Sequence, residues 1–155
     1  MSFPRITLSP LILLWAACAA SAGALAEDLA LSGAWVRALP PGQPMTAAYL
    51  DIENTGSVPV VVTGATVEGA GRAEIHATRM ENGLTRMEHL TTLTVQPGQV
   101  VSLAPGDMHL MLFDLAGMPS PGERRRLCLQ FGAGEELCTD AIVSKSAAAS
   151  GHQHH

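Results

Sequence analysis

The sequence is poor in cysteine and in basic residues, and both shortages exclude classes of protein. Three cysteines occur in 155 residues, and none of them forms the C-x-x-C pair of a thiol redox enzyme. Lysine and arginine number 9 against 14 aspartates and glutamates, so the net charge is −5 and a basic surface for nucleic acid is not expected. The one basic run, residues 124–126, is interpreted as the solvated start of a strand.

Common enzyme motifs and helical periodicity are also lacking. The sequence contains neither a G-x-S-x-G nucleophile elbow nor an H-E-x-x-H zinc motif. Beyond the N-terminal segment, apolar residues almost never recur at the three-to-four-residue spacing of an amphipathic helix. We therefore expect a β-protein that is not an enzyme.

The N-terminal segment 1–26 has the composition of a secretory signal peptide. Arg5 gives a positive n-region, residues 11–17 form a short apolar core, and residues 24–26 (Ala-Leu-Ala) match a cleavage site. The apolar core is too short for a stable membrane span. Cleavage leaves 129 residues with a net charge of −6, because Arg5 is the only charged residue removed.

A lipoprotein processing site at Cys18 is the alternative reading of the same segment. The preceding residues, Leu-Trp-Ala-Ala, resemble such a site, but Trp15 fits the pattern poorly. We therefore expect a soluble, exported product that begins at Glu27 and has no stable insertion in a membrane.

Residues 27–143 read as a single all-β domain. Short alternating apolar segments are separated by turns rich in proline, glycine and asparagine, and Asn82-Gly83 is typical of a two-residue hairpin. This spacing predicts an antiparallel Greek-key β-sandwich or barrel. The nine expected strands are 32–37, 46–54, 58–68, 73–77, 85–90, 100–103, 109–115, 127–131 and 137–143.

Two cysteines remain after cleavage, on the last two expected strands. A short loop at residues 132–134 separates these strands, and pairing Phe131 with Glu135 places Cys128 opposite Cys138. An exported protein meets an oxidising compartment, which favours a cross-strand disulfide. Two buried free thiols are the alternative.

Residues 144–155 depart from the strand pattern. The segment is rich in serine and alanine and ends in His152, His154 and His155, so we expect it to be disordered. Imidazoles without thioethers favour Cu(II), Ni(II) or Zn(II) over Cu(I). The tail is therefore a candidate second metal site, and an inert end or a tag remnant is the alternative.

A soft-metal site is predicted around one strand. His109 and Met111 are two residues apart in the expected strand 109–115 and therefore project to the same face. An imidazole with a thioether suits Cu(I) better than zinc, magnesium or calcium. His76 and Met87 lie on earlier strand-like segments, and His89 repeats the pairing beside Met87. Taken singly, each methionine could be core filler and each histidine a hydrogen-bonded surface residue.

The four residues together resemble a family signature. Ten residues separate His76 from Met87 and twenty-one separate Met87 from His109, as in the PCuAC family of periplasmic copper chaperones. Further similar segments are 35–37, 47–56, 73–76 and 106–112, and the resemblance extends over about residues 34–143.

The resemblance implies a cupredoxin-like sandwich that binds Cu(I) through His76, Met87, His109 and Met111. It also implies delivery of copper towards the CuA centre of cytochrome c oxidase, with its subunit II or another CuA assembly factor as acceptor. His89 stands where the family usually has an apolar residue or proline, and it offers a fifth donor. The cysteine pair is not general in the family, whereas the tail resembles extensions that bind a second copper, which we expect to be Cu(II).

Other copper functions remain alternatives. Copper storage or scavenging would use the same ligands. A blue-copper electron carrier would need a cysteine thiolate, but neither Cys128 nor Cys138 is closely followed by histidine or methionine. A structural sandwich with packed methionine and histidine side chains would bind no copper.

Overall fold

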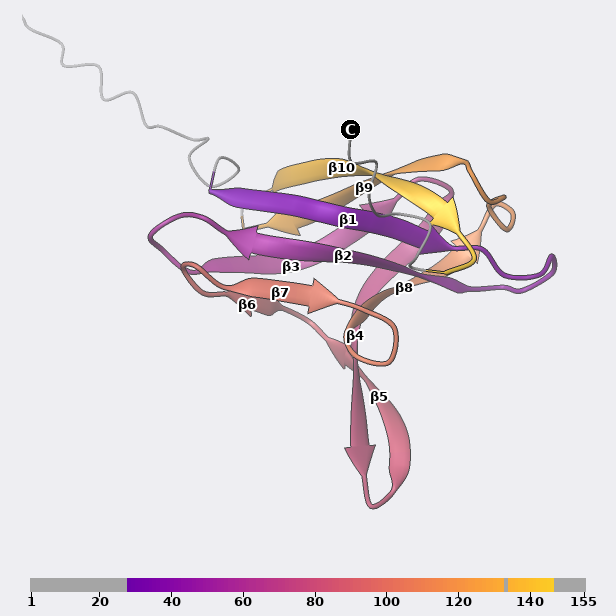
Figure 1. Cartoon of the computed structure of the whole chain (residues 1–155), viewed down its shortest axis with the longest axis horizontal. Coiled ribbons are helices and arrows are strands. Elements are labelled where there is room, and N and C mark those ends of the chain that lie inside the picture. Colours follow the sequence, from indigo (N-terminus) through magenta and orange to yellow (C-terminus); the bar gives the residue numbers. More distant parts are fainter. Residues whose placement is uncertain (1–27, 133, 147–155) are drawn as a thin grey trace, which may run out of the picture.

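The computed structural model describes residues 28–132 and 134–146. The predicted signal peptide, Cys18 and the three tail histidines lie outside these ranges. Within the ranges every regular element is a β-strand, and no helix is long and apolar enough to cross a membrane. The strands are β1 (Leu29–Arg37), β2 (Thr46–Asn54), β3 (Val60–Val67), β4 (Ala70–Glu81), β5 (Leu84–Leu90), β6 (Leu93–Val95), β7 (Val100–Leu103), β8 (His109–Leu115), β9 (Arg124–Phe131) and β10 (Glu135–Ser144) (Figure 1).

Seven of these strands close into a barrel. The strand order in the sheet is β5-β4-β8-β2-β1-β10-β9-β3-β6. The seven strands from β4 to β3 in this order form the closed barrel, because β4 and β3 also pair with each other. Among the described strands only β1 and β10 pair in parallel. β5, β6 and β7 extend the barrel from β4, β3 and β2. The predicted all-β sandwich or barrel is confirmed.

Alternation of side chains along the strands places the hydrophobic core inside the barrel. In β8, Leu110 and Leu112 are fully buried and belong to that core, whereas His109, Met111 and Phe113 occupy the opposite face. The same period of two presents the predicted ligands away from the core. Other fully buried core residues are Ile52, Val62, Val95, Leu127, Leu129 and Phe131.

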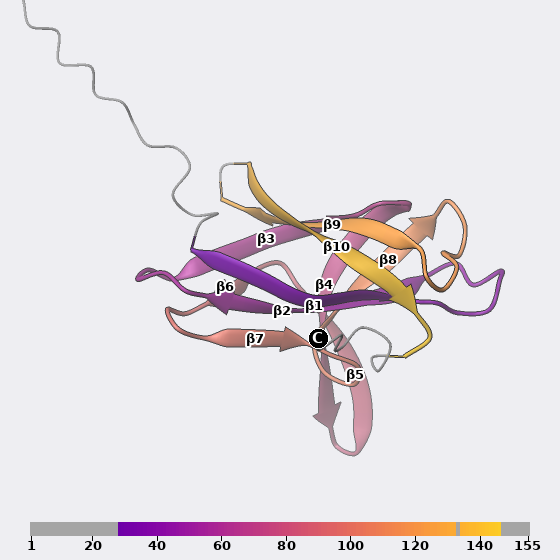
Figure 2. The ribbon, with the colours of Figure 1, turned by 45° about the horizontal axis from the view of Figure 1, so that its top comes forward.

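The β4–β5 hairpin projects from the body of the barrel (Figures 1 and 2). Its turn is Asn82-Gly83, with φ of 52° and 79°, and positive φ at both positions is the requirement of a type I′ turn. The predicted hairpin is confirmed, although β4 is longer than expected. Its outer part buries little apolar surface, and two ion pairs lie on it, Arg79–Glu88 at 2.7 Å and Arg86–Glu81 at 3.2 Å.

The other expected strands agree closely with the structure. Segments 46–54, 100–103 and 109–115 have the bounds that the sequence predicted. β6 was not predicted, because its three residues are too few to show a period of two. Ser144, which the sequence assigned to the tail, is buried and ends β10 opposite Arg37 of β1.

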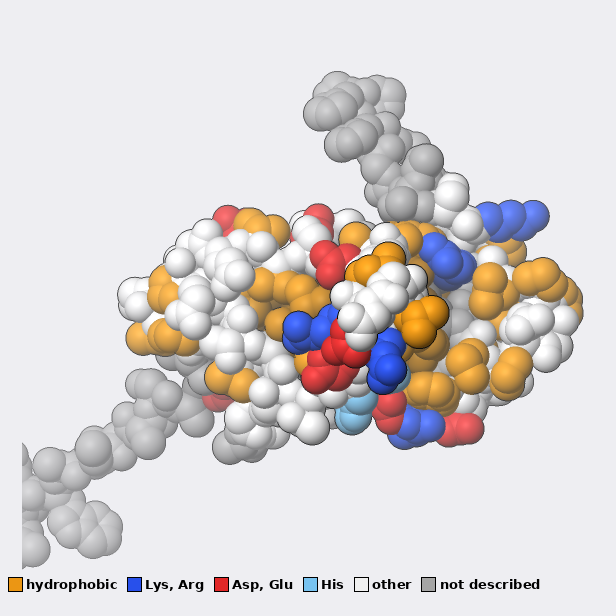
Figure 3. Space-filling model, turned by 90° about the horizontal axis from the view of Figure 1, so that it is seen from below, with side chains coloured by type: hydrophobic (Ala, Val, Ile, Leu, Met, Phe, Trp, Pro, Cys, Tyr) orange, Lys and Arg blue, Asp and Glu red, His pale blue; other side chains and the backbone are white. Residues whose placement is uncertain are grey.

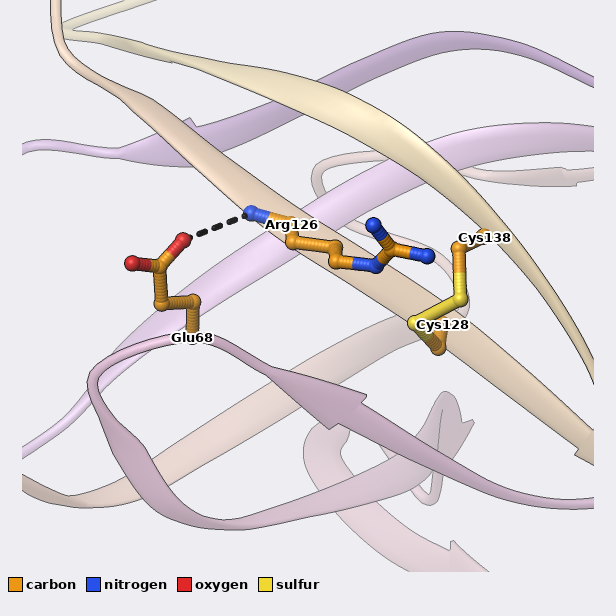
Figure 4. The surroundings of a disulfide bond; sticks show 4 residues. All are labelled: Glu68, Arg126, Cys128 and Cys138. Atoms are coloured by element: carbon orange, nitrogen blue, oxygen red, sulfur yellow. Dashed lines mark hydrogen bonds between the residues drawn. A yellow bond between two sulfur atoms is a disulfide. The ribbon is translucent and has the colours of Figure 1, made fainter.

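β9 and β10 carry the two cysteines in the predicted register. Phe131 pairs with Glu135, and Cys128 pairs with Cys138. The two sulfurs are bonded, and the bridge spans neighbouring strands (Figure 4). Nearby, the backbone N–H of Arg126 donates to the Glu68 carboxylate at 3.3 Å, which links β9 to the end of β3. The basic run 124–126 forms the start of β9.

Candidate metal centre

The pairing of β4 with β8 brings three of the four predicted ligands together. His76 lies opposite His109, and Glu74 lies opposite Met111. Residues directly opposite in an antiparallel pair share a face, and residues two apart on one strand share it too. His76, His109 and Met111 therefore project from the same face of this pair, with the two imidazole centroids 6.0 Å apart.

The pairing of β4 with β5 adds the fourth predicted ligand to that face. Met87 lies opposite Thr78, which is two residues beyond His76 on β4. His89 lies opposite His76, and its ring stacks on that imidazole with centroids 5.5 Å apart. The register thus gathers all four predicted ligands, and His89 beside them, on one sheet face formed by β5, β4 and β8.

His109 is held in an orientation that leaves one nitrogen available. Its side chain is buried, and its Nδ1–H donates to the carbonyl oxygen of Asp107 at 3.1 Å. A carbonyl oxygen only accepts, so Nδ1 carries the proton in the neutral ring and Nε2 keeps its lone pair. Histidine ligands in metal sites are commonly fixed by such a bond from the second ring nitrogen.

His76 uses the other ring nitrogen for its hydrogen bond to the protein. Its Nε2 lies 2.9 Å from the Glu74 carboxylate, to which it donates, and its Nδ1 is buried with no hydrogen-bond partner. The hydrogen bond from His76 lowers the pKa of Glu74 below its ordinary value; partial burial opposes this shift, and the adjacent charge of Arg72 adds to it. Glu74 is thus a carboxylate, and the lone pair of His76 Nδ1 has no partner within the described protein.

Three of the four predicted ligands, Met87, His109 and Met111, line an open pocket of about 370 Å³, whereas His76 lies on the same sheet face outside the lining of that pocket. Of the predicted ligands in its lining, His109 is the most enclosed at 6 % exposure, whereas Met87 is 59 % exposed. Met45, which the sequence reasoning missed, lines the same pocket. It precedes β2 by one residue and lies two residues before Ala47, the partner of Met111. No local signal in the sequence identifies it, because its place beside Met111 depends on the pairing of β2 with β8.

The wall of this pocket on the β1–β2 side is aromatic and cationic. Trp35 and Tyr49 stack with centroids 4.4 Å apart, and the Arg37 guanidinium lies 5.3 Å from the Tyr49 ring. Burial raises the pKa of Tyr49, and the Arg37 charge opposes that rise. In segments 28–132 and 134–146, no carboxylate forms an ion pair with Arg37. This wall therefore places one positive charge beside the pocket, and the Tyr49 ring lies 6.4 Å from the His109 ring.

A second group of potential donors does not form a metal site. Ligand atoms of Cys128, Glu136 and Cys138 lie within 4.8 Å of one another, but the two sulfurs are bonded to each other. A disulfide offers no thiolate, and a blue-copper centre requires one. The cysteines also lie on β9 and β10, whereas the predicted ligands lie on β4, β5 and β8. The structure therefore gives no support to the electron-carrier alternative.

The fold and its histidine–methionine face define the class of the protein. It is a cupredoxin-like β-barrel domain of the kind found in PCuAC domains. The chain belongs to the family whose model is described as "LpqE-like: Putative lipoprotein LpqE-like", which matches residues 29–143. The resemblance drawn from the sequence is thereby confirmed for the fold, and the family that the chain belongs to is the LpqE-like one.

Individual relatives agree with this assignment. "Putative lipoprotein Lxx21020" of Leifsonia xyli subsp. xyli (strain CTCB07) is 35% identical over 119 residues, which are 76% of this chain and 70% of that protein. The solution structure of CuI-DR1885 from Deinococcus radiodurans is 30% identical, with a TM-score of 0.62 over 80% of this chain and 83% of that one. The apo PCuAC domain from PmoF1 is 26% identical, with a TM-score of 0.63 over 77% and 95%.

Proposed function

We propose that this protein is a copper chaperone that binds one Cu(I) through His76, Met87, His109 and Met111. The observation that carries the proposal is the shared sheet face, on which two imidazoles each bond one ring nitrogen to the protein and leave the other with a lone pair. Two thioethers beside two imidazoles form a soft donor set. The similarity to the solution structure of CuI-DR1885 supports the same assignment.

Four neutral ligands suit transport better than permanent storage. Imidazoles and thioethers leave the bound ion with about its own single positive charge, and the carboxylate of Glu74 is paired with His76 and Arg72. A thioether binds copper without losing a proton, so it can be displaced by another soft donor directly. The exposed position of Met87 gives an acceptor access to one ligand first.

The acceptor and the compartment follow from the same proposal. We place the protein outside the cytoplasm, in the periplasm, because of the predicted signal peptide and the lipoprotein descriptions of its family and of its relative from Leifsonia xyli. The resemblance to PCuAC chaperones supports delivery to the CuA centre of cytochrome c oxidase, either to subunit II or to another CuA assembly factor. The fold and the pocket fit a carrier, and no catalytic role is proposed.

Anaerobic titration with Cu(I) against a competing chelator tests the proposal. The mature protein should take up one tightly held Cu(I). Replacement of both Met87 and Met111 by leucine keeps their bulk and removes both sulfurs, and should weaken binding by about tenfold or more per sulfur, about 1.4 kcal/mol each. Met80→Leu is the matched control, because Met80 is 72 % exposed on the same hairpin and does not line the pocket. Unchanged affinity in the double variant would contradict the ligand assignment.

A second, weaker site for Cu(II) is proposed between the tail and this pocket. Ser144 at the end of β10 pairs with Arg37, which lines the pocket, so the tail leaves the barrel beside the copper site. The eight residues from Ser144 to His152 reach at most about 26–29 Å. His152, His154 and His155 can therefore come to the pocket or to His89.

A further inference from the structure

Met45 occupies a position on the copper face that the four-ligand assignment leaves unused. The register that pairs Ala47 with Met111 carries Met45, two residues earlier, to the same face as Met111. Met45 lines the pocket together with His109, Met87 and Met111. Three thioethers and one imidazole thus line one hollow.

The exposed positions of two of these methionines have no explanation in packing. Met45 is 40 % exposed and Met87 is 59 % exposed, and neither packs against the hydrophobic core. They reach the pocket from separate elements, Met87 from β5 and Met45 from the segment that enters β2. Figure 3 shows hydrophobic side chains on the surface around the projecting hairpin. The pocket therefore has a thioether on its β5 side and another on its β2 side.

We propose that Met45 is an additional copper ligand that replaces Met87 during transfer; this inference rests on the proposed Cu(I) site. The proposed site already has four donors, from His76, Met87, His109 and Met111. Met45 is therefore a fifth donor, which binds copper only when Met87 leaves. In the exchange, one copper–sulfur bond to Met45 forms as the bond to Met87 breaks. Copper stays Cu(I) throughout, and no proton moves because a thioether carries none. Copper thus remains in the pocket while the position of Met87 is opened to an acceptor.

A double-mutant cycle on Cu(I) affinity tests the reserve role. Met45→Leu alone should change affinity by less than about twofold, and Met87→Leu alone should weaken it about tenfold, because Met45 takes the vacant position. The Met45→Leu/Met87→Leu variant should lose about a further tenfold, a coupling within the range for residues that share a site. Additive effects would overturn the inference. Met80→Leu combined with Met87→Leu is the matched control and should equal Met87→Leu alone.

Two further measurements separate failure of this inference from failure of the proposed function. X-ray absorption of Cu(I)-loaded Met87→Leu should retain two sulfur scatterers, and that of the Met45→Leu/Met87→Leu variant should show one. Transfer of Cu(I) from Met45→Leu to a bicinchoninate chelator should be about tenfold slower than from the unaltered protein, while Met80→Leu should transfer at the normal rate. If the Met87→Leu/Met111→Leu variant binds Cu(I) with normal affinity, the proposed Cu(I) site itself is wrong. If that variant binds Cu(I) weakly but Met45→Leu has no effect in any variant, only the inference about Met45 fails.

Discussion

His76 and His109 lie directly opposite one another on β4 and β8, with ring centroids 6.0 Å apart, and they use opposite ring nitrogens for their hydrogen bonds to the protein. His76 donates from Nε2 and His109 from Nδ1. In the proposed site, the nitrogens available to copper would therefore be Nδ1 of His76 and Nε2 of His109. This asymmetry follows from the two acceptors, a carboxylate two residues before His76 and a backbone carbonyl two residues before His109.

The Glu74 carboxylate should raise the affinity for Cu(I) through His76. Glu74→Gln keeps an oxygen that can accept the bond from Nε2–H but removes the charge that strengthens it. Loss of such a partner commonly lowers metal affinity 10–100-fold, and we expect about tenfold in the anaerobic chelator competition. Glu88→Gln is the control, because Glu88 pairs with Arg79 on the opposite face of the hairpin. Equal effects of the two changes would show that only overall charge matters.

Cys128 and Cys138 should be oxidised in the exported protein, and their bridge should support the fold without serving the copper site. The cysteines are ten residues apart, and an entropic treatment of so short a loop gives about 2–3 kcal/mol of stabilisation. A variant with serine at both positions should lose about this free energy of unfolding in denaturant and bind Cu(I) normally. Mass spectrometry of the intact exported protein should show two fewer hydrogens than the dithiol. Two free thiols in that measurement would refute the bridge.

The histidine tail should supply the second, divalent site. Truncation after Ser144, which preserves all of β10, should abolish the weaker Cu(II) site and leave the Cu(I) affinity unchanged. Because imidazoles bind metal only after losing a proton, Cu(II) uptake should fail below about pH 6, near the ordinary pKa of histidine. The thioethers do not titrate, so Cu(I) uptake should decline less steeply with acid. A truncated protein that still takes up two coppers with unchanged affinities would exclude the tail.

The processed N-terminus distinguishes the two routes of export. Cleavage after Ala26 predicts a mature protein that begins at Glu27 and is free of lipid. The family description names a lipoprotein, and in this sequence the alternative processing site for lipid attachment is Cys18. Metabolic labelling with palmitate and intact mass of the exported protein decide between them, and Cys18→Ser is the control. Label that disappears in Cys18→Ser would replace our expectation of a soluble product with an anchored one.

The parts of the fold that depend on local pattern could be predicted from the sequence. Alternation in β8 placed His109 and Met111 on one face, and Asn82-Gly83 placed the hairpin that carries Met87. The pairing of Cys128 with Cys138 followed from the short loop between their strands. In each case neighbours in the sequence determine the register.

The parts that depend on distant contacts could not be predicted in this way. Barrel closure rests on the pairing of Ala65 with Ala73 between β3 and β4 and on the parallel pairing of β1 with β10. Neither pairing leaves a periodic signal in one sequence. Met45 was missed for a related reason, because its place at the pocket depends on which strand pairs with β2.

The parallel alignment of β1 and β10 gives the molecule a direction. Because the two strands run the same way, the chain enters β1 at one end of the barrel and leaves β10 at the other, where Arg37 borders the proposed copper pocket. The nine residues of β1 separate these ends by about 26 Å. A lipid attached on the N-terminal side would thus hold the end of the barrel where β1 begins close to the bilayer. The pocket and the start of the histidine tail would then face away from the bilayer, towards a docking acceptor.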